Sequence, residues 1–395
     1  MNMTRRSACW LLLAAALTMT APQQPAVAST VQWQQLMASE DGVSLAVDGG
    51  TAVVGAPGED KMKGAAYVFV RTGTTWTQQA RLAAAEATEY SIFGGAVAVS
   101  GDTILIGAGS DGNHGAVYVF VRSGGKWQQQ ARLLAEDSRP DDNFGISVAV
   151  SKDTAVIGAY RADSAKAPLD PAHAGQGAAY IFVRSGDRWR QQAKLTAADG
   201  IPDSGTFGAE VTADGDTALV ARPALNLAHV FFRSGGKWAE QAKAAGRSAA
   251  LQGDTALIGS QTGSADPAKK ALPAAAPGSV SVFKRAGGLW TLQTLLTAKD
   301  APADPAFGAL VAVDGKTAVI AATERKDAAK PGSVYLFANK GGSWQEQAKL
   351  PAAEGMPVIH SLALSGGTMA AVMGKQASRA ESAAYVTALP ASAAQ

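Results

Sequence analysis

The sequence predicts an all-β fold: one closed ring of seven four-stranded units, completed by the chain's own N-terminal strand. Three observations carry this prediction. A short stretch that opens with tryptophan recurs along the chain, three other short stretches recur between the tryptophans, and the two ends of the chain complement each other. Four-stranded units repeated four to eight times are typical of a β-propeller, so we predict a single seven-bladed propeller.

Tryptophan marks one strand of each unit. Clear copies read "WTQQARL" at 76, "WQQQARL" at 127 and "WRQQAKL" at 189, whereas the first copy, "WQQLMAS" at 33, is looser. The regular recurrence of these residues predicts packing at the outer strands rather than stacking on a ligand. The repeat units open near residues 33, 76, 127, 189, 238, 290 and 344.

The other three strands of a unit have their own signatures. In the second unit they read "FGGAVAVS" at 93, "GDTILIGA" at 101 and "GAVYVFVR" at 115. Such stretches are short, rich in Val, Ile, Tyr and Phe, and bounded by Gly, Asp and Ser, which are strand signals. No window shows a sustained helical period.

The order of the strands predicts how the ring closes. The chain begins on a tryptophan strand at Trp33 and ends near Leu389, on the type of strand that precedes a tryptophan strand. The last unit therefore lacks its outer strand, and the N-terminal strand is the spare one. Pairing these two strands leaves no open edge at the seam.

The links between strands divide the ring into two faces. One face carries tight turns such as "SGDT" and "RSGGKW", in which glycine supplies the positive φ of a short hairpin. The opposite face carries links of variable length, with long ones at 160–176 and 260–277. Variable loops on a rigid scaffold are a usual place for binding.

Residues 1–28 are expected to be a secretory signal peptide, and residues 29–395 the propeller. A basic start, an apolar run and the triplet Ala26-Val27-Ala28 form the pattern of a cleavable leader. We therefore expect the protein to be exported and to be periplasmic or extracellular after cleavage near Ala28.

Cleavage would also change the composition. The only cysteine, Cys9, leaves with the leader, and so do Arg5 and Arg6, which turns 35 basic residues into 33 against 33 acidic ones. A chain without net charge has no field that attracts nucleic acid. We expect no nucleic acid partner, no membrane insertion, and a monomer.

Aspartate pairs in the loops before the Phe-Gly strands are the candidate binding residues. A row of carboxylates around the central pore could bind a cation or sugar hydroxyls. Alternatively these aspartates shape turns and cap backbone N–H groups, which we favour because the loops resemble one another. The candidates are Asp137, Asp141, Asp199, Asp203, Asp300 and Asp304.

No cofactor and no catalytic residue is predicted. The aspartates could bind calcium, but the sequence lacks the acidic loop motif of calcium sites, so no motif supports a calcium site. The four histidines, His114, His173, His229 and His360, share no metal-ligand spacing. Nucleophile and phosphate-binding motifs are also missing.

The repeats resemble a known family. Phe-Gly at the start of a unit, Gly55-Ala56-Pro57 in the first unit, and "GAVYVF" are similar to FG-GAP repeats, the units of the seven-bladed propeller in integrin α-subunits and in many bacterial exported proteins. The resemblance covers 33–390 and implies extracellular recognition or adhesion. The integrin-type repeat binds calcium in an acidic loop, where this chain has only "SGDT".

These observations predict an exported recognition or adhesion protein without enzymatic activity, which binds a protein or a glycan through its variable loop face. Two alternatives stay open. One is a polysaccharide-active enzyme that uses loop carboxylates, and the other is a passive scaffold of the cell envelope.

Overall fold

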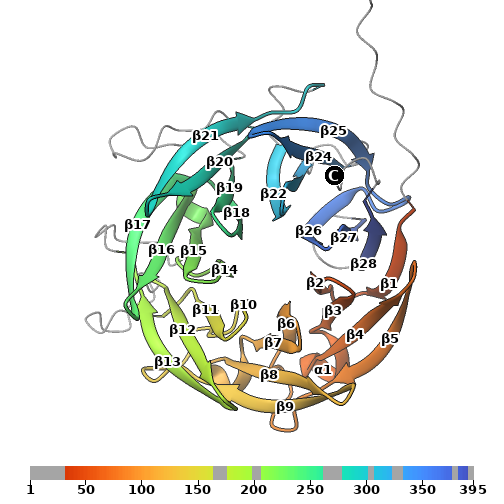
Figure 1. Ribbon diagram of the computed structural model, residues 1–395. Helices are drawn as coiled ribbons and strands as arrows, with labels where there is room; N and C mark the ends of the chain where they lie inside the picture. Colours follow the sequence, from red (N-terminus) through yellow and green to blue (C-terminus); the bar gives the residue numbers. More distant parts are fainter. Residues whose placement is uncertain are drawn as a thin grey trace, which may run out of the picture.

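A computed structural model describes residues 32–162, 176–197, 206–260, 278–300, 307–322, 332–375 and 381–389. The described residues form seven antiparallel sheets of four strands each, arranged in a ring around a central channel (Figure 1). The prediction of a single seven-bladed propeller is confirmed. We number the blades along the chain, from the sheet that contains β2 to the sheet that contains β26.

Each blade runs from an inner strand at the channel to an outer strand at the rim. Blades one to three contain β2 (Ser44–Asp48), β3 (Thr51–Ala56), β4 (Ala65–Thr72), β5 (Thr75–Leu82), β6 (Phe93–Ser100), β7 (Thr103–Ala108), β8 (Ala116–Ser123), β9 (Lys126–Leu133), β10 (Ser147–Ser151), β11 (Thr154–Ala159), β12 (Ala178–Ser185) and β13 (Arg188–Leu195). Blades four and five contain β14 (Glu210–Asp214), β15 (Thr217–Arg222), β16 (Leu227–Ser234), β17 (Lys237–Ala245), β18 (Ser248–Gln252), β19 (Thr255–Ser260), β20 (Ser279–Ala286) and β21 (Leu289–Leu296).

Blade six contains β22 (Phe307–Asp314), β23 (Thr317–Ala322), β24 (Ser333–Lys340) and β25 (Ser343–Pro351). Blade seven contains β26 (Val358–Ser365), β27 (Thr368–Gly374), β28 (Ser382–Ala388) and β1 (Gln34–Ser39). Three short helical turns, α1 (Glu59–Met62), η1 (Asp111–Asn113) and η2 (Pro223–Leu225), lie in links between the second and third strands of their blades.

The N-terminal strand closes the ring, as the order of the strands predicts. β1 pairs antiparallel with β28, from Gln34 opposite Val386 to Ser39 opposite Ser382. The Gln34 side chain also donates to the backbone oxygen of Trp76 and accepts from the Trp76 N–H, at 3.0 and 3.2 Å. The strand therefore completes blade seven and holds the outer strand of blade one at the same time.

Trp33 differs from the other repeat tryptophans. It lies before β1 and donates its indole N–H to the backbone oxygen of Pro351. Trp127, Trp189 and Trp238 instead donate to a glutamine on the outer strand of the preceding blade, at 2.8–3.0 Å. This contact between blades explains why glutamine recurs three residues after tryptophan.

The Phe-Gly pair brings two neighbouring blades into contact. Phe93 is fully buried in a cluster that contains Val68 of blade one and Tyr118 of blade two. Gly94 has a φ of 90°, and its carbonyl oxygen accepts a hydrogen bond from Ser44 of blade one at 2.8 Å. A Cβ on Gly55 would overlap that same carbonyl group. Glycine at both positions therefore permits close packing of the two backbones.

The tight turns form a second ring of contacts between blades. In every blade the last residue of the inner strand accepts a hydrogen bond from a backbone N–H in the first hairpin of the following blade. The acceptor–donor pairs are Asp48–Gly101, Ser100–Lys152, Ser151–Gly215, Asp214–Gly253, Gln252–Gly315, Asp314–Gly366 and Ser365–Gly49. The last pair joins blade seven to blade one, so this ring is closed as well.

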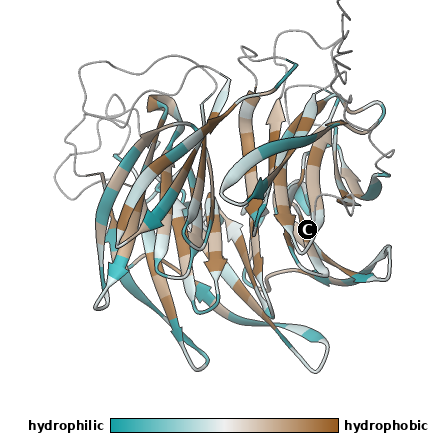
Figure 2. Ribbon diagram, turned by 45° about the horizontal axis from the view of Figure 1, so that its top comes forward, coloured by the Kyte–Doolittle hydropathy of each residue, from teal (hydrophilic) through white to brown (hydrophobic). Residues whose placement is uncertain are grey.

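Hydropathy follows the architecture. The second strands of blades one, two and three are buried along their whole length, whereas the outer strands alternate between buried and exposed residues. Figure 2 shows hydrophobic residues along the strands, with hydrophilic residues interspersed and at many turns. The seven buried clusters together form a core that runs around the ring.

Candidate binding face

The face opposite the tight hairpins, here called the loop face, contains most of the unusual backbone. It consists of the links from the second to the third strand of each blade and from the outer strand to the next blade. Among the described residues, eleven non-glycine residues have positive φ; ten of them lie in these links and Lys152 lies in a tight hairpin. The ten are Asp60, Lys61, Met62, Tyr90, Ile92, Asn113, Asp141, Asn143, Asn226 and Glu381. Strained backbone of this kind tends to gather at functional sites.

Two links, β3–β4 within blade one and β5–β6 between blades one and two, contain half of these residues. Asp60, Lys61 and Met62 are three consecutive residues with φ between 51° and 62°, and Ile92 has a φ of 58° despite its β-branched side chain. Left-handed backbone costs free energy in such residues. The conformation therefore has to be held by the surrounding contacts.

Backbone hydrogen bonds hold these two links side by side. The N–H of Tyr90 donates to the Lys61 oxygen, the N–H of Ile92 to the Met62 oxygen, and the N–H of Phe93 to the Lys63 oxygen, at 2.9–3.2 Å. This pairing leaves the side chains of Tyr90 and Met62 exposed, at 63% and 41%. A large aromatic and a flexible apolar side chain are thus presented on a fixed backbone, next to an exposed ion pair between Lys61 and Glu89.

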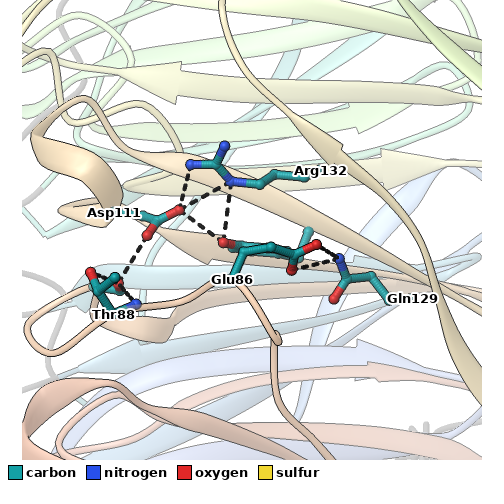
Figure 3. Close-up of polar contacts among 7 residues, drawn as sticks. Glu86, Thr88, Asp111, Gln129 and Arg132 are labelled. Atoms are coloured by element: carbon teal, nitrogen blue, oxygen red, sulfur yellow. Dashed lines mark hydrogen bonds and ion pairs between the residues drawn. The ribbon is translucent and has the colours of Figure 1, made fainter.

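Beneath this region lies a buried carboxylate. Asp111 in η1 is 2% exposed and accepts hydrogen bonds from the hydroxyls of Ser91 and Tyr118, at 2.9 and 2.8 Å. The guanidinium of Arg132 contacts the same carboxylate at 2.8 Å (Figure 3). Ser91 lies between Tyr90 and Ile92, so Asp111 ties the strained link to the third and fourth strands of blade two.

The neighbouring residues extend this network. Figure 3 shows Gln129 beside Glu86, and the amide of Gln129 donates to both carboxylate oxygens of Glu86, at 3.0 and 3.3 Å. The Ser91 hydroxyl also accepts from the backbone N–H of Thr88 at 2.8 Å. Side chains therefore fix the β5–β6 link and the β7–β8 link relative to each other and to β9.

The same arrangement recurs in four other blades. A carboxylate contacts an aromatic residue of the third strand and a cationic residue of the outer strand. We call each such set a clamp. Besides Asp111–Tyr118–Arg132, the clamps are Glu59–Tyr67–Arg81, Asp137–Tyr180–Lys194, Glu240–His229–Lys243 and Asp300–Tyr335–Lys349.

Two of the predicted aspartates are clamp residues. Asp137 and Asp300 accept the hydroxyl of Tyr180 and Tyr335, at 2.8 and 3.0 Å, and each also contacts a lysine. Asp141 has a φ of 67° and donates its backbone N–H to the Asn113 oxygen at 2.7 Å. Asp199, Asp203 and Asp304 lie outside the described residues. The structure thus gives Asp137, Asp141 and Asp300 contacts that shape and fasten the loops.

The clamps shift the pKa values of their members. Burial raises the pKa of the Asp137 carboxyl, but the hydrogen bonds from Lys194 and Tyr180 outweigh burial, and its pKa lies below the usual value. The same balance, with Lys349 and Tyr335, lowers the pKa of Asp300. Burial, together with the hydrogen bond to Asp111, raises the pKa of Tyr118 above its usual value.

The clamps are not among the predicted sites, although the sequence carries part of their signal. Arginine or lysine stands five residues after the tryptophan in five outer strands, and tyrosine or histidine stands in the third strand opposite it. The carboxylate comes from the link between the second and third strands in two blades, from the link before the blade in two others, and from the outer strand itself in blade four, so its position does not repeat in the sequence. Only the fold brings the three groups together.

Two cavities are related to this face. One, of about 380 Å³, lies at the closing blade and is lined by Ala38, Ser39, Glu40, Met356, Lys375, Glu381 and Ser382. The other is the central channel, of about 330 Å³, which is lined by the inner strands of all seven blades. Its side chains are mainly Ala, Val and Leu, and Glu210 is the charged residue in the lining.

Within the described ranges, no group of three or more His, Cys, Asp or Glu side chains could hold a metal ion. No helix among those residues is long and apolar enough to cross a membrane.

Comparisons with known proteins agree with this geometry. A model of the FG-GAP repeat matches residues 40–69, 76–120, 127–182 and 290–337. The chain carries FG-GAP repeats, and its described strands form a seven-bladed β-propeller. No curated protein matches it.

Solved structures show the fold alone. A structure of U3-55K is 12% identical, covers 90% of this chain and 98% of its own, and has a TM-score of 0.56. Sqt1 of Saccharomyces cerevisiae is 10% identical with a TM-score of 0.47, covering 92% of this chain and all of its own. Sqt1 of Chaetomium thermophilum is 12% identical with a TM-score of 0.49, covering 87% and 83%.

Proposed function

We propose that the protein is an exported recognition propeller that binds a partner protein through the links around blades one and two. The observation that carries the proposal is the exposure of Tyr90 and Met62 on a strained backbone that a buried network holds in place. Tyrosine is a frequent anchor of protein interfaces. Because the backbone is already fixed, the loops lose less conformational entropy on binding.

The leader expected at residues 1–28 and the FG-GAP repeats support export, to the periplasm or the cell exterior. We propose that the protein acts there as the integrin-like repeats of bacterial exported proteins do, in recognition or adhesion. The partner is recognised without catalysis or a metal ion.

A glycan is the second candidate for the ligand, because an exposed tyrosine can also stack on a sugar ring. The enzyme alternative has less support. A general acid needs a carboxyl whose pKa is raised, and each of the carboxyl pKa shifts resolved in the described residues, those of Glu59, Glu86, Asp137, Glu240 and Asp300, is a decrease.

The test uses the chain from Ser29 onward, immobilised and exposed to cell-envelope and secreted proteins and to a glycan array. A Tyr90→Ser, Met62→Ser double variant should lose at least about tenfold in affinity for the bound protein. Thr74→Ser, in the exposed β4–β5 hairpin on the other face, is the matched control and should bind normally. Equal binding by both variants, or binding to glycans alone, would contradict the proposal.

A further inference from the structure

The outer strand of blade five differs in chemistry from the other outer strands. Its residues 289–296 read "LWTLQTLL", without a charged side chain. Leu289 is 71% exposed and Leu295 is 45% exposed. Among the described residues, no other outer strand has a large apolar side chain that is exposed. β21 lies at the rim of the ring (Figure 1), at the end of its sheet, so its outer edge is not paired with another described strand.

The other blades provide an internal comparison, because strand register identifies equivalent positions. Leu295 lies opposite Ser281 of the third strand. In the blades that have a clamp, the equivalent residue of the outer strand is a cation that lies opposite a tyrosine or histidine, namely Arg81, Arg132, Lys194, Lys243 or Lys349. Leu292 lies opposite Phe283. In those blades the outer-strand residue opposite the equivalent phenylalanine is polar, namely Gln78, Gln129, Gln191, Glu240 or Glu346. Blade five has thus replaced the cation and the neighbouring polar residue by leucine.

Leu289 extends the replacement to the start of the strand. Equivalent positions carry Thr75, Lys126, Arg188, Lys237 and Ser343, all exposed. Packing within the blade accounts for Leu292, which contacts a buried cluster. It does not account for a leucine that is 71% exposed.

Charged side chains on edge strands, lysine above all, normally prevent pairing between molecules. Five outer strands carry such charges, namely β5, β9, β13, β17 and β25. β1 also lacks charge, but it is shorter and presents Gln34, Gln35 and Ser39. β21 is therefore the eight-residue outer strand without this protection.

We propose that β21 is a self-association site, at which two copies of this chain pair their blade-five outer strands edge to edge about a two-fold axis. A second copy fits this edge for two reasons. The strand has no charge that would repel its own copy. The exposed leucines Leu289 and Leu295 also lie near opposite ends of the strand, so an antiparallel two-fold pair brings the Leu289 end of each copy beside the Leu295 end of the other.

The pairing adds backbone hydrogen bonds between the two β21 strands and buries Leu289 and Leu295 of both copies. One strand pair buries less than the roughly 1,200 Å² of a standard stable interface. We therefore expect a dissociation constant in the micromolar range. The proposal departs from the monomer expected from the sequence, and it concerns a different surface from the loop face.

The experiment is sedimentation velocity on the chain from Ser29 onward, which contains all seven blades, between about 1 and 100 μM. Dimers should form in the upper part of this range. The Leu289→Lys, Leu295→Lys double variant should remain monomeric, and its thermal unfolding should show that it is folded. Thr75→Lys, at the matching exposed position of β5, should dimerise like the unsubstituted chain.

A second measurement does not depend on the leucine variants. The chain from Ser29 has no cysteine, so a single Thr291→Cys substitution can be cross-linked to its own copy by a short bis-maleimide. Thr77→Cys on β5 occupies the equivalent position and should give no cross-linked dimer. A chain that stays monomeric at 100 μM, a dimer that persists in the double lysine variant, or equal cross-linking at both cysteines would overturn the proposal.

Discussion

Substituting Gly55 by alanine tests the packing between blades one and two. A Cβ at this position would lie 2.8 Å from the carbonyl carbon of Gly94 and would overlap the oxygen of that carbonyl and the Ser44 hydroxyl. Carbon atoms in contact are normally 3.5–4.0 Å apart. The obstacle is backbone, so β6 has to move relative to β3.

The cost can be worked from two terms. Overpacking a tight interior costs about 1–3 kcal/mol, and the hydrogen bond from Ser44 to Gly94 that would be distorted contributes about 1 kcal/mol. We expect Gly55→Ala to lower the free energy of unfolding by about 3 kcal/mol. Urea unfolding followed by tryptophan fluorescence measures this change.

Gly50→Ala is the matched control in the same hairpin. A Cβ on Gly50 would meet no atom within 4 Å, and its φ is not in the left-handed region. The control should change the unfolding free energy by less than about 0.5 kcal/mol. If Gly55→Ala unfolds at the same urea concentration as Gly50→Ala, the close packing of the two blades is refuted.

Three further predictions follow from named contacts. Gln34→Ala removes both hydrogen bonds to Trp76 and should lower the free energy of unfolding by about 1–2 kcal/mol. Gln35 is exposed, and Gln35→Ala should lower the free energy of unfolding by a smaller amount. An equal decrease in both variants would show that Gln34 does not hold the seam. The pKa values of Asp137 and Asp300 are lower in the folded chain than in the unfolded chain, where the pKa of aspartate is about 4. The two ionised carboxylates therefore stabilise the fold above about pH 4, and this stability is lost as the pH falls through the lowered pKa. In Asp137→Asn, thermal stability should therefore be lower at pH 7 and should decrease less between pH 5 and pH 2, and an unchanged pH profile would argue against the clamp. Millimolar calcium and EDTA should leave the unfolding temperature unchanged, and a rise with calcium that EDTA reverses would disprove the account of the aspartates.

The architecture could be predicted because repeats reveal it. Seven copies of similar strands define the blades, and the order of strand types at Trp33 and Leu389 defines the closure, which β1 and β28 confirm. These signals are local or depend on the order of elements alone. The sequence analysis places Trp33 on the closing strand, whereas β1 begins one residue later, at Gln34.

The contacts at the loop face were harder to predict. The carboxylate of the clamp on Tyr118 comes from the same blade, at Asp111, whereas the carboxylate on Tyr180 comes from the link before the blade, at Asp137. Pattern searches need a constant spacing, and these groups have none. The backbone strain at Ile92 was also invisible, because a β-branched residue gives no sequence signal for positive φ.

The absence of charge from β21 is visible in the sequence, but its consequence is not. "LWTLQTLL" can be aligned with the other outer strands by its tryptophan. Its meaning depends on knowing that Leu289 and Leu295 are exposed and that the strand lies at an edge. Both facts require the three-dimensional arrangement.

Site-specific photo-cross-linking tests most directly whether a partner binds the loop face at blades one and two. A photoreactive phenylalanine analogue would replace Tyr90 on the loop face and, in a separate variant, Thr74 on the hairpin face, each in the native cell. We predict a discrete cross-linked protein from position 90 and none from position 74. Cross-links from position 74 alone, or the same products from both positions, would contradict the account.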